Sequence, residues 1–379
     1  MKVCFAFPMN EYMPKGDVLQ FLTLLKAIDR KVNKLPAEQR NEHIIDCVFS
    51  YPFVNGQDGF MFNHVNFYHT NHLTEMITQL DRKRDYDFIF VRGRKESLDL
   101  LKADPDVKTK LLVLSIHYNT QDKQEMNEML YLLEHVRLLF FQSAPWAHRF
   151  KTYAQYNGAA HHHLNQKIQV LPQYVEIFSK EKTSKIKRLR PLQLAQIGVI
   201  RTRYVLPMAI RATELIRTKI PQVFLHVAYP AIEANYKETA LPLLQSPVVK
   251  DYGQLSLWQS KELILTAGIG LALIFDDTVN KNPTYSYQSR VLECLSLGVP
   301  VITTKTAANI HLLGKQYPLY IRNEHDILHC YRRLSSPRFY QKMSDTVRKI
   351  GKQFIYDIAI EKFWSLLVKE FNSQPEKTH

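Results

Sequence analysis

Two groups of charged residues lie within or directly after apolar segments, and side chains of these types can bind a ligand or take part in catalysis. Glu293 is a lone carboxylate in the apolar helical pattern of "QSRVLECLSLGVPVITTKT", residues 288–306. That helix is predicted to stop at 298–300, Gly-Val-Pro, where the strand VIT follows at once. Arg201 and Arg203 come directly after the apolar run "LAQIGVI". A carboxylate only accepts hydrogen bonds, and a guanidinium donates to anionic oxygens, so both groups are suited to a polar, anionic ligand.

The elements that must position these residues alternate between strand and helix along the whole chain. Buried strand patterns separated by amphipathic helical patterns are typical of an α/β fold with parallel sheets. The alternation restarts after a basic, Pro-ended link, which predicts two doubly wound domains, at 1–185 and 186–350. Residues 351–379 contain an amphipathic helix that we expect to pack back across the domains. Ligands of such sheets bind beyond the carboxyl ends of the strands, so a cleft between the domains is the expected site.

Composition limits the class of protein. The chain has 379 residues, of which 45% are hydrophobic and 23% charged, as in soluble globular proteins. No apolar run reaches the ~18–20 residues of a membrane span, and the first residues resemble a buried strand rather than a signal peptide. The four cysteines are widely separated and without a CxxC motif, which indicates buried thiols in a reducing compartment. We therefore expect a cytoplasmic protein.

The formal net charge of +14 favours an anionic partner such as nucleic acid, anionic lipid or a phosphorylated small molecule. Part of the excess is local, because 179–191, "SKEKTSKIKRLRP", has six Lys or Arg against one Glu. This stretch is either a solvated linker or a basic collar that docks on an anionic membrane at the inner face of the cell. No RNA- or DNA-binding module is recognisable, so nucleic acid is not an expected partner.

The order of these motifs resembles the retaining glycosyltransferases of the GT-B fold, family 4 in particular. The specific part is the helix with Glu293, followed by Gly298, Pro300 and Val301 in a Gly-x-Pro-Val pattern that enters a strand. The remaining similarity covers nearly the whole chain at a low level. The resemblance implies two Rossmann-like, doubly wound domains that face each other across a cleft. It also implies a nucleotide sugar as the donor substrate, with no cofactor and no metal.

The resemblance implies a role for several residues. Arg201 and Arg203 would hold the diphosphate leaving group and Glu293 the hydroxyls of the ribose. The donor sugar would contact the loop formed by Ser286, Tyr287, Gln288 and Ser289. Gly16, in "MPKGDVLQFLTLL", would allow close approach of the loop before the first helix. Thr304, at the end of "VITT", completes the expected substrate-binding residues of the second domain.

The sequence also departs from the family pattern. The family pattern has two glutamates, the second eight positions after the first. Glu293 matches the second, and Tyr285 stands where the first, which contacts the donor sugar, would be; this leaves the identity of the sugar open. Gly198 is followed by Val199 rather than by an arginine, so Arg201 or Arg203 must take its place. Asp276 and Asp277 are adjacent acids of the kind that cap turns, and we do not expect them to bind a cation.

Polar residues of the first domain could complete the site. His117 ends the apolar run "KLLVLSI" and would contact the donor sugar or an oxyanion, unless it is an ordinary loop histidine. Arg92 and Arg94 follow the strand "YDFIF" and could bind an anionic acceptor. His161–His163 are expected in a surface loop and not at a metal, since three consecutive histidines of a regular element cannot converge on one ion.

The sequence thus predicts a retaining, metal-independent glycosyltransferase that moves a sugar to a glycan, or to a lipid-linked or anionic polymer acceptor. Two alternatives stay open. One is a catalytically inactive GT-B scaffold, favoured by Tyr285 in place of the glutamate. The other is a nucleotide-sugar epimerase with the same pair of domains. Dinucleotide oxidoreductases are disfavoured because no GxGxxG follows the first strand.

Overall fold

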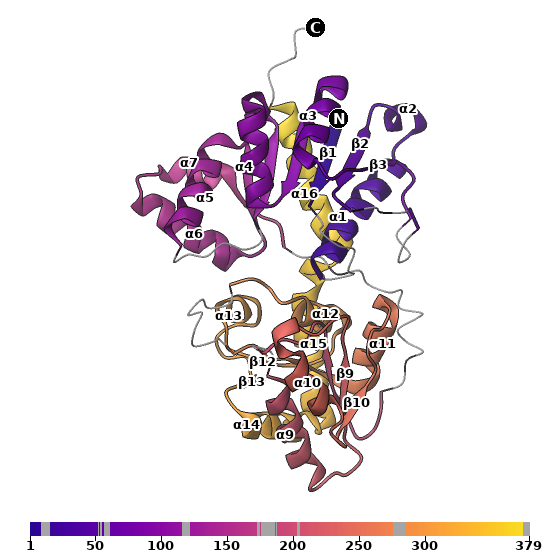
Figure 1. The fold of residues 1–379 in the computed structure, drawn as a ribbon. Helices are drawn as coiled ribbons and strands as arrows, with labels where there is room; N and C mark the ends of the chain where they lie inside the picture. Colours follow the sequence, from indigo (N-terminus) through magenta and orange to yellow (C-terminus); the bar gives the residue numbers. More distant parts are fainter. Residues whose placement is uncertain are drawn as a thin grey trace. The chain divides into compact units, whose positions relative to one another are not determined.

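The computed structural model describes residues 1–8, 16–51, 53, 55–56, 61–115, 122–172, 175, 186, 188–202, 205–275 and 285–373. The chain forms two compact units. The first comprises residues 1–13, 17–172 and 359–379, and the second comprises 14–16 and 173–358. Each unit is built on one parallel sheet with helices packed against it, so the predicted α/β class is confirmed (Figure 1).

The first unit holds, in its described residues, a seven-stranded sheet of order β3-β2-β1-β4-β5-β6-β7. The strands are β1 (Lys2–Phe7), β2 (Ile44–Phe49), β3 (Val65–His69), β4 (Phe88–Arg92), β5 (Leu111–Ser115), β6 (Leu138–Phe141) and β7 (Ile168–Val170). The helices are α1 (Gly16–Asn33), α2 (Ala37–Arg40), α3 (Leu73–Arg84), α4 (Arg94–Ala103), the 3-10 helix η2 (Pro105–Thr109), α5 (Lys123–His135), α6 (Ala144–Tyr156) and α7 (His161–Lys167). Because helices cover a parallel sheet on both faces, its central strands are almost continuously apolar.

The C-terminal helix α16 (Tyr356–Asn372) packs on this first sheet, although it is the last element of the chain (Figure 1). The ring of Phe363 lies edge-on to Phe90 of β4 and Phe140 of β6, with centroids 5.7 and 5.8 Å away. Arg137 donates from Nε to Oε2 of Glu370 at 2.9 Å and from Nη2 to its carbonyl at 2.6 Å. The tail helix is therefore part of the core of the N-terminal unit.

The second unit holds, in its described residues, a six-stranded parallel sheet of order β10-β9-β8-β11-β12-β13. Its strands are β8 (Gln193–Ile197), β9 (Leu225–Ala228), β10 (Val249–Asp251), β11 (Gly268–Ala272), β12 (Val301–Thr304) and β13 (Tyr320–Ile321). Its helices are α9 (Leu206–Arg217), η4 (Ala234–Tyr236), α10 (Lys237–Leu244), α11 (Leu257–Ala267), α12 (Ser289–Leu297), α13 (Ala307–Leu313), α14 (Glu324–Leu334), α15 (Pro337–Gly351) and η5 (Lys352–Phe354).

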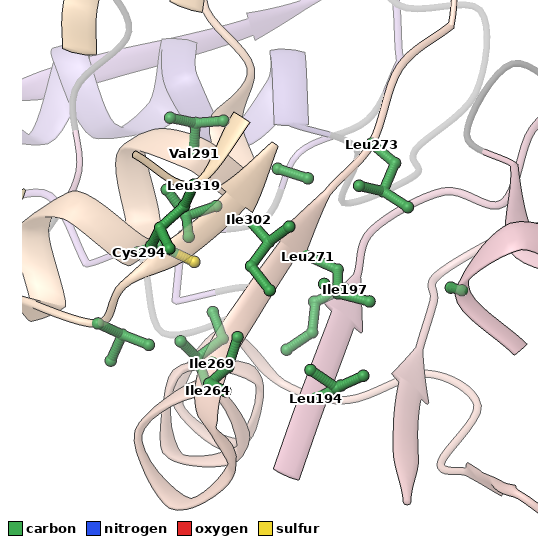
Figure 2. Close-up of a cluster of buried hydrophobic side chains, with 14 of the residues drawn as sticks. Leu194, Ile197, Ile264, Ile269, Leu271, Leu273, Val291, Cys294, Ile302 and Leu319 are labelled. Carbon is green, nitrogen blue, oxygen red and sulfur yellow. The ribbon is translucent and has the colours of Figure 1, made fainter. Parts of the chain in front are cut away.

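Helix α12 and strand β12 confirm the helix-stop-strand pattern predicted around Glu293. The apolar face of α12 buries Val291 and Cys294 beside Ile302 of β12 and Leu271 of β11 (Figure 2). Gly298 ends the helix in the left-handed region, with φ of +66°. Its carbonyl accepts a hydrogen bond from Oγ of Ser344 at 2.6 Å, which ties this turn to α15. The C-terminal end of α12 is thereby fixed against α15.

Two sequence expectations about local structure are wrong. His161–His163 do not lie in a loop but begin the short helix α7, because Leu164 and Ile168 anchor the segment in the core. The stretch 50–72 has the aromatic, amide-rich composition of a loop that faces carbohydrate or covers the sheet, but it contains strand β3. All five residues of that edge strand are at least partly exposed, and the ring of Phe67 stacks on that of Phe49 with ring centres 6.1 Å apart. The four cysteines are free and buried, as predicted.

Candidate functional site

The strand order of the second sheet indicates that a ligand site lies at the carboxyl ends of its central strands. Strands β8 and β11 are neighbours, but the chain continues from β8 towards β9 and β10, and from β11 towards β12 and β13. The connections after β8 and β11 therefore leave on opposite sides of the sheet. Parallel α/β sheets bind ligands in the crevice that such a switch point creates at the carboxyl ends of the strands. The residues that follow β8, and the helix α12 that follows β11, are thus the candidate site.

The segment after β8 is held firmly in place. Gly198 has a φ of +113°, and its N–H donates to the carbonyl of Ala228 at 2.9 Å. Ile200 forms an isolated parallel bridge with Ile232, in the segment after β9. Arg201 follows directly, with a partly exposed side chain, at the position predicted from the sequence. Arg203 lies outside the described residues.

Arg290, which the sequence analysis did not single out, lies at the centre of the switch point. It is on the first turn of α12 and is 8% exposed. Its Nη2 lies 3.4 Å from the carbonyl of Val199, and a Cβ built on Gly198 would come within 3.2 Å of it. A positive charge is thereby set against the end of β8. Arg290 stands three positions before Glu293, and one helical turn is the spacing that places two side chains on a common face. This spacing is the feature of the sequence that could have indicated a role for Arg290 beside Glu293.

Glu293 lies one turn further along α12, and its side chain is partly buried. Burial raises the pKa of the Glu293 carboxyl, while the positive charges of Lys261 and Arg290 act in the opposite direction. Lys261 is on α11, which packs against α12, and it is 1% exposed. A carboxylate between two cations can stay ionised in a partly buried place and accept hydrogen bonds from hydroxyl groups.

The N-terminal end of α12 has polar groups to offer a ligand. No side chain caps this helix, so its first N–H groups are not satisfied by a capping residue. Gln288, the N-cap residue, is 8% exposed, and neither atom of its amide has a hydrogen-bond partner among the described residues. Buried amides in native proteins are normally hydrogen-bonded, so an unpartnered one calls for an explanation. An anionic ligand on the helix end would supply the missing acceptor.

The neighbouring residues of the predicted sugar loop differ in their surroundings. Tyr285, Ser286 and Ser289 are partly exposed. Tyr287 is buried, and its hydroxyl lies 2.9 Å from Nδ1 of His311 on α13. Its ring stands edge-on to Phe354, with centroids 5.6 Å apart. Tyr287 therefore fixes the backbone of the loop from the inside, whereas the side chains of Tyr285, Ser286 and Ser289 can meet a ligand.

Thr304 is buried at the end of β12, where its Oγ1 accepts a hydrogen bond from the N–H of Ile274 at 3.2 Å. This bond holds the segment after β11 against β12. In this structure Thr304 shapes the edge of the crevice, and its predicted contact with a substrate stays a prediction.

The first sheet has a switch point of its own, between β1 and β4. Arg92 ends β4 there, with its guanidinium 4.4 Å from the ring centre of Phe7 at the end of β1. Arg94 is held by two carboxylates of α5, Glu125 and Glu128, each at 2.8 Å. The hydrogen bond to Glu125 raises the pKa of Arg94, and the pair of contacts joins α4 to α5. Gly16 is the first residue of α1, and His117 lies outside the described residues.

Comparison with solved structures gives the architecture a name. HepE from Anabaena, in complex with UDP and glucose, matches with a TM-score of 0.70 at 12% identity, over 97% of this chain and all of that one. A glycosyltransferase from Rickettsia africae matches with 0.71 at 11% identity, over 98% and 99% of the two chains. The chain has the GT-B fold. A putative UDP-N-acetylglucosamine 2-epimerase from Listeria monocytogenes matches with 0.59 at 11% identity, over 99% and 97%. Neither a protein-family model nor a curated protein matched the sequence.

The described residues of this GT-B chain contain neither a grouped set of metal ligands nor a membrane-spanning helix. Among the described residues, no three His, Cys, Asp or Glu side chains are grouped so that they could hold a metal ion. Asp276 and Asp277 lie outside those residues. No helix of the described part is long and apolar enough to cross a bilayer. Of the basic stretch 179–191, residues 179–185 and 187 are outside the described part, and Arg188 lies over the ring of Tyr340 at 4.8 Å.

Proposed function

We propose that this GT-B chain is a retaining glycosyltransferase of the family 4 type, which transfers a sugar from a nucleotide-sugar donor to a glycan, or to a lipid-linked or anionic polymer. The observation that carries the proposal is the polar end of α12 at the switch point, with Arg290 against Gly198 and the unpartnered amide of Gln288 beside it. HepE, which has the same fold, was solved with UDP and with UDP-glucose.

The proposed chemistry places the diphosphate of the donor at this helix end. When the bond between the anomeric carbon and the phosphate oxygen breaks, the leaving diphosphate gains negative charge. Arg290, Arg201 and Arg203 are the cations that would take up this charge, together with the N–H groups of α12. We propose that these groups do so without a divalent metal, and that Glu293 accepts hydrogen bonds from the vicinal hydroxyls of the ribose.

Thermal shift of the full chain with UDP, GDP, CMP and ADP tests the donor site. A ligand at 100 times its Kd should stabilise the protein by about 2.7 kcal/mol, or roughly 5–10 °C for a unit of this size. We expect one nucleotide to give this shift, and Arg290→Gln and Glu293→Ala each to remove most of it. Arg322→Gln, an exposed arginine of the same unit, is the matched control and should keep the shift. No shift with any nucleotide would refute the assignment of the donor site.

Gln288 gives an independent arm of the test. Replacing it by Leu removes a buried amide that has no partner in the described residues, so the free protein should be as stable as wild type or more stable. The nucleotide shift should nevertheless shrink. If Gln288→Leu binds the nucleotide like wild type, the amide does not contact the donor.

The Listeria match keeps the epimerase alternative in view, and the products distinguish the two reactions. A transferase releases the nucleoside diphosphate, slowly to water and faster with an acceptor. An epimerase leaves the sugar nucleotide intact but converts its sugar, which NMR of the reaction mixture would detect. A scaffold would bind the nucleotide without either reaction. Activity that survives EDTA would support the metal-independent form of the proposal.

A further inference from the structure

The described end of the basic stretch 179–191 lies far from the donor site. Arg188 and Arg190 precede β8, at the amino end of the second sheet, whereas the donor site is at the carboxyl ends of the strands. Strand β8 has five residues, so roughly 16 Å of strand lies between the two ends. An anion held by these arginines would therefore occupy a site of its own.

Arg188 is held over the start of β11. Its guanidinium lies 4.8 Å from the ring centre of Tyr340, and a Cβ built on Gly268, the first residue of β11, would come 3.7 Å from its Cδ. The N–H of Leu189 donates to the carbonyl of Thr266 at 2.9 Å, which ties the segment to α11. Because the Arg188 side chain is already partly buried, it loses less freedom when it binds an anion.

Arg348, on α15, is held over the turn between α12 and β12. A Cβ built on Gly298 would come 2.6 Å from its Nε, so the guanidinium packs directly on the backbone of that glycine. One turn earlier on α15, Oγ of Ser344 donates to the Gly298 carbonyl. The position of the Arg348 guanidinium thus follows from the packing of α15 along α12 (Figure 1).

Tyr340 shows that three arginines come together at this end of the sheet. Its hydroxyl donates to the carbonyl of Gly268 at 2.8 Å. Burial raises the pKa of this tyrosine, whereas the charges of Arg188, Arg190 and Arg348 act in the opposite direction. The three guanidinium groups are therefore all close enough to one buried hydroxyl to act on its charge.

The three arginines follow the order of the strands. Burial raises the pKa of Tyr331 to about 12, and the charge of Arg190 opposes this. The Tyr331 hydroxyl donates to the carbonyl of Leu192, directly before β8, at 2.9 Å. Arg190 thus lies near the start of β8, Arg188 near that of β11 and Arg348 near that of β12, and these strands are neighbours in this order. Neighbouring strands are about 4.8 Å apart, so the arginine row is about 10 Å long.

Few carboxylates neutralise the arginine row. In the described part of the chain, neither Arg188 nor Arg190 forms an ion pair. Arg348 lies 3.6 Å from Asp345, and both side chains are about half exposed, so water weakens this contact. Like charges held together repel one another, and an oxyanion that bonds to several guanidinium groups removes this repulsion.

We propose that Arg188, Arg190 and Arg348 form a second anion site, which binds a small ligand with two or three linked phosphate groups. Arginine suits such a ligand because its planar guanidinium can donate two parallel hydrogen bonds to phosphate oxygens. Linked phosphates fit better than a single one, because one phosphate cannot contact both ends of the row. The inference does not depend on the proposed function, since no residue of the donor site takes part.

Isothermal titration of the full chain with tripolyphosphate tests the second site. The donor site should also attract this probe, so we expect two bound molecules in wild type and one in Arg290→Gln. In both backgrounds Arg188→Gln and Arg348→Gln should each weaken one binding event about tenfold. Arg338→Gln is the matched control, because Arg338 is exposed on the same helix as Arg348 and should leave the affinity within about twofold. If the donor site binds no phosphate, wild type should bind one molecule, which Arg188→Gln still weakens.

Three outcomes would overturn the proposal. Equal losses in Arg188→Gln and Arg338→Gln would show that the attraction comes from net charge alone. Equal affinity for sulfate and tripolyphosphate at the same ionic strength would show that the site does not require linked phosphates. A single-stranded oligonucleotide that binds through the same arginines more tightly than tripolyphosphate would show that the ligand is a phosphodiester chain and not a small molecule. Urea denaturation of each variant establishes that a loss of binding is not a loss of fold.

Discussion

The guanidinium of Arg290 lies against Gly198, so close that a Cβ built on the glycine would come 3.2 Å from Nη2. The contact joins the first turn of α12 to the end of β8 across the switch point of the second sheet. Two features of Gly198 permit it, the missing side chain and a φ of +113° that L residues rarely adopt. The position of Arg290, the candidate phosphate-binding cation, thus depends on the glycine that directly follows β8.

Gly198→Ala should therefore affect both stability and ligand binding. The strained backbone should cost about 1–3 kcal/mol of unfolding free energy, and the new methyl group should displace the guanidinium of Arg290. Gly158→Ala is the control, because Gly158 has a φ of +91° but open space around it. Chemical denaturation should show similar losses for both, whereas nucleotide titration should show a loss only for Gly198→Ala. Equal nucleotide affinity in the two variants would contradict a role for this contact.

A second prediction concerns the packing of α12 against β11, beneath the candidate site. Gly270 of β11 faces Cys294 of α12, and a Cβ on Gly270 would come 2.3 Å from the Cys294 Sγ. Gly270→Ala alone should cost about 1–3 kcal/mol by overpacking. Adding Cys294→Ala removes the sulfur and should restore part of that loss, so the double variant should be more stable than Gly270→Ala in urea denaturation. Strictly additive losses would show that the two side chains do not share this space.

Gly351 differs from Gly270, because the atoms that crowd it belong to the backbone and no second substitution can remove them. A Cβ there would come 2.3 Å from the carbonyl oxygen of Leu295, which is backbone of α12. Gly351→Ala should lower the unfolding free energy by about 1–3 kcal/mol or more, even though alanine favours the helical conformation. A variant as stable as wild type in urea would show that α15 can move away from α12 without cost.

Glu293 makes a prediction about pH. Burial raises the pKa of its carboxyl, so the folded state holds a proton at pH values where the unfolded state has released it. Stability contributed by this group therefore falls as pH rises from the ordinary glutamate range through the raised pKa. In Glu293→Gln this slope should disappear. The free-energy difference between the two proteins should therefore change in this direction only. An unchanged difference from pH 4 to 7 would contradict it.

The local features of the site could be predicted from the sequence because their signals are local. The helix with Glu293 is stopped by a glycine and followed by a strand after Pro300, and all of this lies within seventeen residues, 288–304. Features that depend on distant partners could not be predicted. The role of Arg290 follows from its contact with Val199, which requires β8 and β11 to be neighbours in the sheet. The unpartnered state of the Gln288 amide likewise depends on packing and not on sequence pattern.

Other differences have the same physical origin. Strand β3 has a weak hydrophobic pattern because it is an edge strand whose residues are all at least partly exposed, so the surrounding turn residues led to the expectation of a loop. Arg94 was expected to be available for an acceptor, but Glu125 and Glu128 reach it from a helix some thirty residues away. Single-sequence reasoning identifies charges well but cannot tell which of them already have a partner in the fold.

His226 supplies the last prediction, on the stability of the second unit in acid. It lies on β9, is 3% exposed, and its Nδ1 lies 2.9 Å from the hydroxyl of Tyr252, while Nε2 has no partner among the described residues. Burial, with the charge of Lys250, lowers the pKa of His226 to about 4. At pH values between this lowered pKa and the ordinary imidazole pKa, the unfolded chain therefore binds more protons than the folded chain. The free energy of unfolding is highest above this pH range and falls as the pH drops through it.

The loss should be on the order of 3 kcal/mol between pH 7 and pH 4, from the ordinary pKa of about 6.5 for histidine. His226→Phe keeps a ring to stack on Tyr252 and should make this part of the pH dependence vanish in urea denaturation. His329→Phe, on the exposed face of α14, is the matched substitution and should leave the pH dependence as in wild type. If both variants lose stability in acid as steeply as wild type, the buried neutral imidazole is not the group responsible.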